Sequence, residues 1–129
     1  MNCSSLLPEA YASFLEFASE TVAGVRYRIA RVSFARRLEL VRKVRDLAQR
    51  IEFLEAGGDA TEQFEGSVLG AEIDRLYLEW GLQAVEGLVI DGELATPCSL
   101  IEKGPECLAR EIVRRIRSEC HLSEEERKN

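Results

Sequence analysis

The sequence predicts a mainly α-helical protein with a small β component (α+β), and two observations support this fold class. Apolar residues recur at intervals of three and four through most of residues 33–82 and again through 105–116, the spacing of amphipathic helices. Between residues 25 and 30 the pattern changes to strict alternation, the period of a half-buried strand. We therefore expect a long antiparallel helical hairpin and a C-terminal helix, with a small N-terminal β-hairpin and a short Asp-Gly turn segment.

The N-terminal part of the chain predicts the β-hairpin. The segment VRYRIARVS, residues 25–33, alternates in polarity. Its apolar face is made of Val25, Tyr27 and Ile29. The expected partner strand is FLEF at residues 14–17, although residues 6–20 also have Pro8 and an apolar spacing that fit a short helix.

Residues 33–82 predict two long helices that run antiparallel. Ser33 is a suitable N-cap for the first helix. One apolar stripe of that helix consists of Phe34, Leu38, Val41, Val44, Ala48 and Ile51. The stripe is widened, enough to contact more than one neighbour, by Leu40, Leu47 and Leu54. Gly57-Gly58 ends the helix, and Asp59 with Glu62 forms a capping-box pattern that starts the second.

The remaining residues predict a hairpin turn and a terminal helix. Asp91-Gly92 lies inside GLVIDGELA and is a dipeptide favoured in two-residue hairpin turns. SLIEKG, residues 99–104, reads as a short helical turn, and Pro105 opens the last helix. The inward face of that helix is expected to be Leu108, Ala109, Ile112, Val113 and Ile116. The polar tail 123–129 is expected to fray or to be solvated.

Length and composition predict one domain, residues 1–129, with a poorly defined segment at 1–23. The chain has 129 residues, 46% of them hydrophobic, which is enough to bury a core without disulfides or metal. No apolar run approaches the roughly 20 residues of a membrane span, and the N-terminus has no basic region ahead of an apolar stretch. We therefore expect a cytoplasmic protein that has no contact with membranes and keeps its thiols reduced.

The net charge of −6 is distributed unevenly. Residues 24–50 have nine Lys or Arg and two acidic residues, whereas residues 51–129 have eight basic and eighteen acidic residues. Two interpretations stay open: the basic segment pairs with the acidic half of the chain, or it contacts an acidic partner. The candidates for contacts with an anion or a nucleic acid are Arg26, Arg28, Arg36 and Arg37.

Two of these arginines occupy an electrostatically unfavourable place. Arg36 and Arg37 lie in the first turn of the predicted helix, where a cation opposes the helix dipole at a cost of a few tenths of a kcal/mol. Something acidic should therefore meet them.

The residues that carry chemistry do not predict an enzyme. His121 is the single histidine, so neither long helix offers the Glu-x-x-His pairs of a di-iron site beside its glutamates. The four cysteines form no C-x-x-C pair, and no glycine pattern for phosphate binding is present. We expect no catalytic residues, no metal site and no cofactor.

The order of several segments resembles a known family. These segments are GVRYRIARVS, the long helix after it, LYLEWGLQAVEGLVIDGELATP, GPECLAREIVRRIR and the closing SEEERKN. Together, over residues 24–129, they resemble the small tail assembly chaperones of tailed bacteriophages and prophages. The likeness is one of layout with short motifs.

The resemblance implies a non-enzymatic assembly factor in the bacterial host cell. Such a factor binds the long helical tape-measure protein and keeps it soluble while the tail tube polymerises around it; an oligomer is compatible with this role. The expected exposed contacts are Leu40, Leu47, Leu54 and Trp80, although Trp80 also fits a core position at the helix end. The alternatives are a nucleic-acid-binding accessory protein that uses the basic segment, and a structural virion or tail-completion component.

Overall fold

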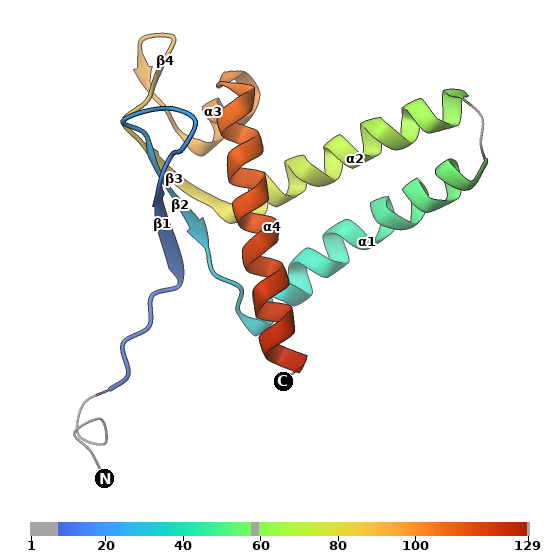
Figure 1. The fold of residues 1–129 in the computed structure, drawn as a ribbon, viewed down its shortest axis with the longest axis horizontal. Coiled ribbons are helices and arrows are strands. Elements are labelled where there is room, and N and C mark those ends of the chain that lie inside the picture. The colour runs from blue at the N-terminus through green and yellow to red at the C-terminus, as the bar shows by residue number, and fades with distance from the viewer. Residues whose placement is uncertain (1–7, 58–59, 129) are drawn as a thin grey trace.

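The computed structural model describes the backbone of residues 8–57 and 60–128, and the side chains of residues 8–50, 52 and 67–121. The described elements are, in chain order, β1 (Phe14–Ala18), β2 (Arg26–Ala30), α1 (Phe34–Gly57), α2 (Ala60–Gly81), β3 (Leu82–Glu86), β4 (Val89–Ile90), β5 (Glu93–Leu94), α3 (Pro97–Lys103) and α4 (Glu106–Lys128). The mainly α-helical fold with a small β component is confirmed (Figure 1).

The strands β1, β2 and β3 form an antiparallel sheet with β2 in the centre. The predicted hairpin is present, since Leu15 pairs with Ile29 and Phe17 with Tyr27. Residues 14–18 are thus a strand rather than a helix. The apolar face of β2 points into the core, where Tyr27 and Ile29 are fully buried.

The sequence did not predict β3. Arg28 pairs with Ala84 and Ile29 with Leu82, so Gln83 is the extra residue of a β-bulge. A bulge moves the following side chains to the opposite face, which removes the alternation that would have revealed the strand.

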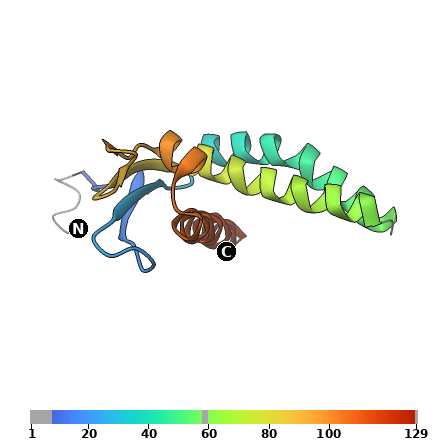
Figure 2. The same cartoon turned by 90° about the horizontal axis from the view of Figure 1, so that it is seen from above.

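The helices α1 and α2 form the predicted antiparallel hairpin, which projects from the rest of the molecule (Figures 1 and 2). Its N-terminal cap is also as predicted, because the Ser33 hydroxyl accepts a hydrogen bond from the Arg36 backbone N–H at 3.2 Å. The outer part of the hairpin has no other element of the described chain beside it in either view. The capping box at Asp59 lies outside the described residues.

Helix α4 crosses the base of this hairpin (Figure 1) and lies beside the sheet (Figure 2). The predicted inward face is confirmed, since Leu108, Ile112 and Ile116 are fully buried. They meet residues from the sheet and from the inner ends of α1, α2 and α3 in one apolar core: Val25, Tyr27, Ile29, Leu40, Leu78, Trp80, Leu82 and Leu100.

Helix α4 continues through most of the polar tail, to Lys128; the expectation that the tail frays or is solvated stays a prediction, because its side chains lie outside the described ones. The physical reason for this continuation lies in the composition of SEEERK. Glu, Arg and Lys are good helix formers, and basic residues at the C-terminal end of a helix interact favourably with its dipole.

The Asp-Gly hairpin turn is confirmed between β4 and β5. Asp91 has a φ of 52° and Gly92 a φ of 82°, so both central residues are left-handed, as in a type I′ turn. Gly87, before β4, also has a positive φ, and a Cβ there would lie 2.2 Å from the Gly24 carbonyl oxygen. Gly92 has open space around the same position.

Alanine substitutions at Gly92 and Gly87 distinguish the cost of a left-handed backbone alone from the added cost of a steric clash. Gly92→Ala is expected to lower the free energy of unfolding by about 1 kcal/mol, the cost of a left-handed alanine. Gly87→Ala is expected to cost about 3 kcal/mol, because the β1–β2 turn must also move away. Urea denaturation measures both values. Equal losses would show that the backbone at residue 24 does not approach Gly87 closely.

Candidate functional site

Helix α1 buries only part of the apolar face that its spacing predicts. Leu40 is the only buried residue among the described side chains of α1, and Val44 packs beside it. The N-terminal part of the stripe that the spacing favours is turned outward, since Phe34 is 90% exposed, Leu38 45% and Val41 41%, whereas Val44 and Ala48 of the same stripe are half-buried. Phe34, Leu38 and Val41, the α1 stripe, lie four and three positions apart and so share one side of the helix.

The expected exposed contacts therefore need correction. Leu40 and Trp80 are each only 5% exposed and belong to the core. Trp80 is buried because the last turn of α2 leads directly into β3, beneath α4. Leu47 is half-buried, and Leu54 lies outside the described side chains. Among the described side chains of α1, the large exposed apolar residues are those of the α1 stripe instead.

Arg36 meets the negative end of a helix. Its guanidinium lies 4.6 Å from the centre of the Trp80 ring and donates a hydrogen bond to the Trp80 carbonyl oxygen, in the last turn of α2. Its other nitrogen lies 3.7 Å from a Glu39 carboxylate oxygen. The C-terminal end of α2 thus compensates the unfavourable position of Arg36 at the start of α1.

The other candidate arginines do not converge on one anion site. Arg28 forms an ion pair with Glu16 at 2.7 Å and covers the Phe14 ring. Arg37 donates to the Cys120 carbonyl oxygen at 2.9 Å. Arg26 is exposed on β2, opposite Glu86 on β3. Arg28, Arg36 and Arg37 are therefore engaged within the protein. The carboxylates that pair with Arg28 and Arg36 are Glu16 and Glu39, and neither belongs to the acidic half at residues 51–129 that was expected to compensate the basic segment.

A groove of about 600 Å³ lies beside the α1 stripe. Its walls come from α1 and from the C-terminal half of α4, and Tyr77 of α2 also lines it. The described lining residues are Arg37, Leu40, Val41, Val44, Arg45, Tyr77, Arg117, Cys120 and His121. Val41 belongs to both surfaces, so the groove and the α1 stripe are continuous.

The floor of the groove is apolar and uncharged. Burial raises the pKa of the Cys120 thiol to about 11, and burial likewise raises the pKa of the Tyr77 phenol. Both groups are therefore neutral at physiological pH. The Tyr77 ring is covered by the Arg117 guanidinium, whose centre is 4.4 Å from the ring centre, and Arg117 also pairs with Asp74 at 2.7 Å.

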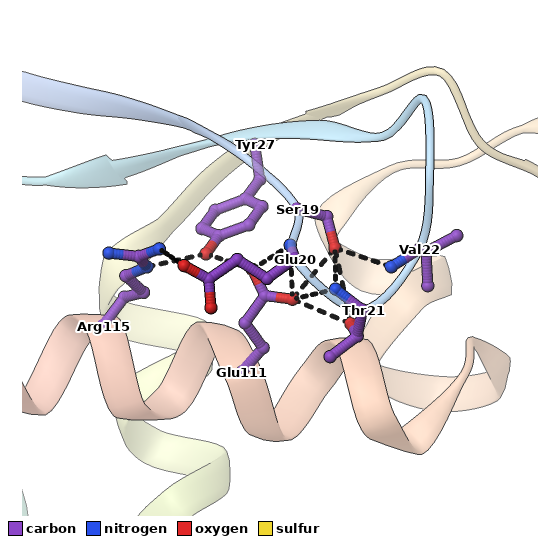
Figure 3. A network of polar contacts seen from close by, with 7 residues as sticks. All are labelled: Ser19, Glu20, Thr21, Val22, Tyr27, Glu111 and Arg115. Atoms are coloured by element: carbon purple, nitrogen blue, oxygen red, sulfur yellow. Dashed lines mark hydrogen bonds and ion pairs between the residues drawn. The ribbon is translucent and has the colours of Figure 1, made fainter.

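A second polar site, which was not predicted above, surrounds the buried carboxylate of Glu111 on α4 (Figure 3). Glu111 is 2% exposed, and its oxygens accept from Tyr27 Oη at 2.7 Å, Thr21 Oγ1 at 2.7 Å and Ser19 Oγ at 2.9 Å. The backbone N–H groups of Glu20 and Thr21 also donate to it. These contacts fasten the β1–β2 turn to α4.

Burial by itself would raise the pKa of Glu111, but the hydrogen bonds from Tyr27, Thr21, Ser19 and the Glu20 backbone lower it to about 2. Burial, and after it the hydrogen bond to Glu111, raises the pKa of Tyr27 to about 12. Arg115 closes the network by donating to Tyr27 Oη at 3.3 Å and to Glu20 at 2.9 Å. A carboxylate with so many donors is a weak base, so its role is structural.

A signal for this network does exist in the sequence. Glu111 lies three residues after Leu108 and next to Ile112, within the apolar arc of α4. A charge on the buried arc of a helix requires partners, and the hydroxyl-rich turn SETV at 19–22 could supply them.

Other kinds of site find no support in the described part of the chain. There, no group of three or more His, Cys, Asp or Glu side chains is arranged to hold a metal ion. Cys98 and Cys107 are exposed and Cys120 is buried, all three as free thiols. Over the same residues, no helix has both the length and the apolar character needed to cross a bilayer.

Comparison with known proteins does not add to this description. No protein-family model matches the chain, and neither the curated proteins nor the solved structures that were compared contain a match.

The Glu111 network should make stability depend on acid pH. Because the pKa of Glu111 is lowered from 4.5 to about 2, its contribution is complete above pH 4.5 and disappears as the pH falls toward 2. Glu111→Gln is expected to cost on the order of 3 kcal/mol at pH 7, about half of that at pH 3 and little at pH 2. Urea denaturation at a series of pH values measures this difference.

A matched control lies on the same helix. Glu106 is exposed and pairs with Arg110 at 3.3 Å, so Glu106→Gln is expected to cost less than about 1 kcal/mol at any pH. If the two variants behave alike, the hydrogen bonds to Glu111 do not hold the β1–β2 turn in place.

Proposed function

We propose that this protein is a non-enzymatic assembly chaperone that binds a long helical partner protein, the role of the phage tail assembly chaperones that its sequence resembles. The observation that carries the proposal is the α1 stripe: Phe34, Leu38 and Val41 are exposed on a helix of which only one described residue is buried. An apolar helix face without a partner in its own fold is a typical surface for binding another helix.

The shape of the molecule supports the same role. The α1–α2 hairpin projects from the body, so both of its long sides are accessible over the outer part (Figure 1). The α1 stripe lies in the first two turns of α1, at the base of the hairpin, and a partner helix that covers it could continue along the accessible side of α1. Covering apolar surface of an unassembled helical protein is what would keep that protein soluble before it is used.

The proposed setting is the cytoplasm of a bacterial cell that produces phage or prophage tails, and the proposed partner is of the tape-measure type. The charge of the protein fits this role, because a net charge of −6 would keep a complex with an apolar partner in solution.

The test is a tagged pull-down from the cells that make the protein, with nuclease treatment and identification by mass spectrometry. The wild-type chain is expected to recover a long helix-rich protein. The double variant Phe34→Asp, Leu38→Asp is expected to lose it, because two carboxylates on the α1 stripe oppose apolar burial. Co-expression of the recovered protein should then give soluble material only with the wild type.

A matched control replaces another exposed apolar pair. Val89 and Leu94 face each other across the β4–β5 hairpin and are 60% and 79% exposed. Val89→Asp, Leu94→Asp is expected to keep the partner. Equal loss in both double variants, or disappearance of every partner after nuclease treatment, would contradict the proposal, and the second result would favour the nucleic-acid alternative.

The correction of Leu40 and Trp80 gives a further prediction. Leu40→Asp is expected to unfold the protein, because it places a charge in the core, whereas Leu38→Asp is expected to leave the free energy of unfolding within about 0.5 kcal/mol. Circular dichroism during thermal unfolding distinguishes the two variants. If the Leu40→Asp protein folds, Leu40 is not a core residue and could be an exposed contact, as first expected.

A further inference from the structure

We infer that the groove between α1 and the C-terminal half of α4 binds an acidic amphipathic helix of the partner, an inference that rests on the proposed function. The groove joins an apolar floor to a basic rim, and these two properties together select the chemistry of the occupant.

The rim carries positive charge in a protein that is acidic overall. Arg37, Arg45 and Arg117 line the groove, and none of its described lining residues is an Asp or Glu. Asp74 compensates Arg117 from α2. Arg45 is exposed, and the ion pairs formed within the described part of the chain do not include it. A partner carboxylate would find a favourable position there.

The apolar floor of the groove determines the second property of the occupant, which is an apolar face. Leu40, Val41 and Val44 from α1 meet Cys120 from α4, and the thiol is neutral. Apolar side chains of the occupant are therefore needed to displace water from the groove. Arg45 lies four residues after Val41, so it continues the side of the helix that the α1 stripe occupies. An occupant lying along that side would contact apolar residues first and the arginine at its end.

The same residues argue against a nucleic acid as the occupant. Proteins that bind single strands offer aromatic faces on which bases stack. Tyr77 is the aromatic residue among the described lining residues, and the Arg117 guanidinium already covers its ring. The apolar floor would also remain unused by a phosphate backbone.

A second groove shows the contrast. It measures about 1110 Å³, lies between α2 and the helices α3 and α4, and includes Val68. Its described lining residues carry both signs, with Glu72, Asp74 and Glu106 beside Arg75, Arg110, Arg114 and Arg117. A mixed lining does not select an acidic occupant, so this groove provides matched controls.

The experiment uses the full-length protein and two labelled helical peptides of about 20 residues. Both peptides have Leu at every third and fourth position, and they differ only in having Glu or Lys at the flanking positions. Fluorescence anisotropy at about 50 mM salt is expected to show the Glu peptide binding about tenfold more tightly than the Lys peptide. The preference should shrink at about 500 mM salt.

Matched variants locate the site. Arg45→Glu is expected to weaken the Glu peptide about fivefold, whereas Arg42→Glu, exposed on the same helix outside the groove lining, is expected to change it little. Val41→Asp is expected to abolish binding. Val68→Asp should not, although Val68 is as exposed as Val41, at 43% against 41%. Circular dichroism verifies that all four variants are folded.

Each other outcome overturns the inference in a recognisable way. If both peptides bind equally well and Arg45→Glu changes neither affinity, the inference that the occupant is acidic is wrong, although the groove would still bind a helix. Failure of both peptides while the pull-down still recovers its helical protein would overturn the groove alone, and failure of both experiments would overturn the proposed function too.

Tighter binding of a single-stranded oligonucleotide that Arg45→Glu abolishes would assign the groove to nucleic acid. A dimer that Val41→Asp dissociates would assign it to a second copy of the chain.

Discussion

The carboxylate of Glu111 determines where α4 lies, because its oxygens are satisfied only when the β1–β2 turn and the Tyr27 hydroxyl rest against that helix. A buried charge without these donors would be strongly unfavourable, so the network admits one arrangement of helix and sheet. The apolar contacts of Ile112 and Ile116 with the core then follow. With α4 in place, its C-terminal half forms one wall of the groove beside α1.

The orientation of α1 depends on a second polar contact. Arg36 stacks on Trp80 and reaches the carbonyl at the end of α2, which ties the first turn of α1 to the last turn of α2. This contact, together with burial of Leu40, turns the side with Phe34 and Leu38 toward solvent. The exposed apolar surface of Phe34 and Leu38 therefore arises because contact between a cation and an aromatic ring determines the rotation of the first turns of the helix.

Most elements of the fold could be predicted from local pattern. Alternation around Tyr27, the caps and spacing of the long helices and the Asp91-Gly92 turn are all properties of short segments, and each is present. Two kinds of feature could not be predicted. The bulge at Gln83 hides the alternation of β3, and the partners of Glu111 come from residues about ninety positions away. The choice between the two stripes of α1 is likewise made by tertiary contacts, which spacing does not contain.

The two walls of the groove are synthesised at different times, because α1 precedes α4 in the chain by about 50 residues. The α1–α2 hairpin is built from neighbouring residues and can form as soon as both helices have left the ribosome. Its apolar side, however, gains a second wall only when Arg117 and Cys120 arrive with α4. In a nascent chain the groove therefore stays incomplete until α4 has also been synthesised and has packed beside α1. The order of the helices along the chain thereby determines when the groove is complete during synthesis.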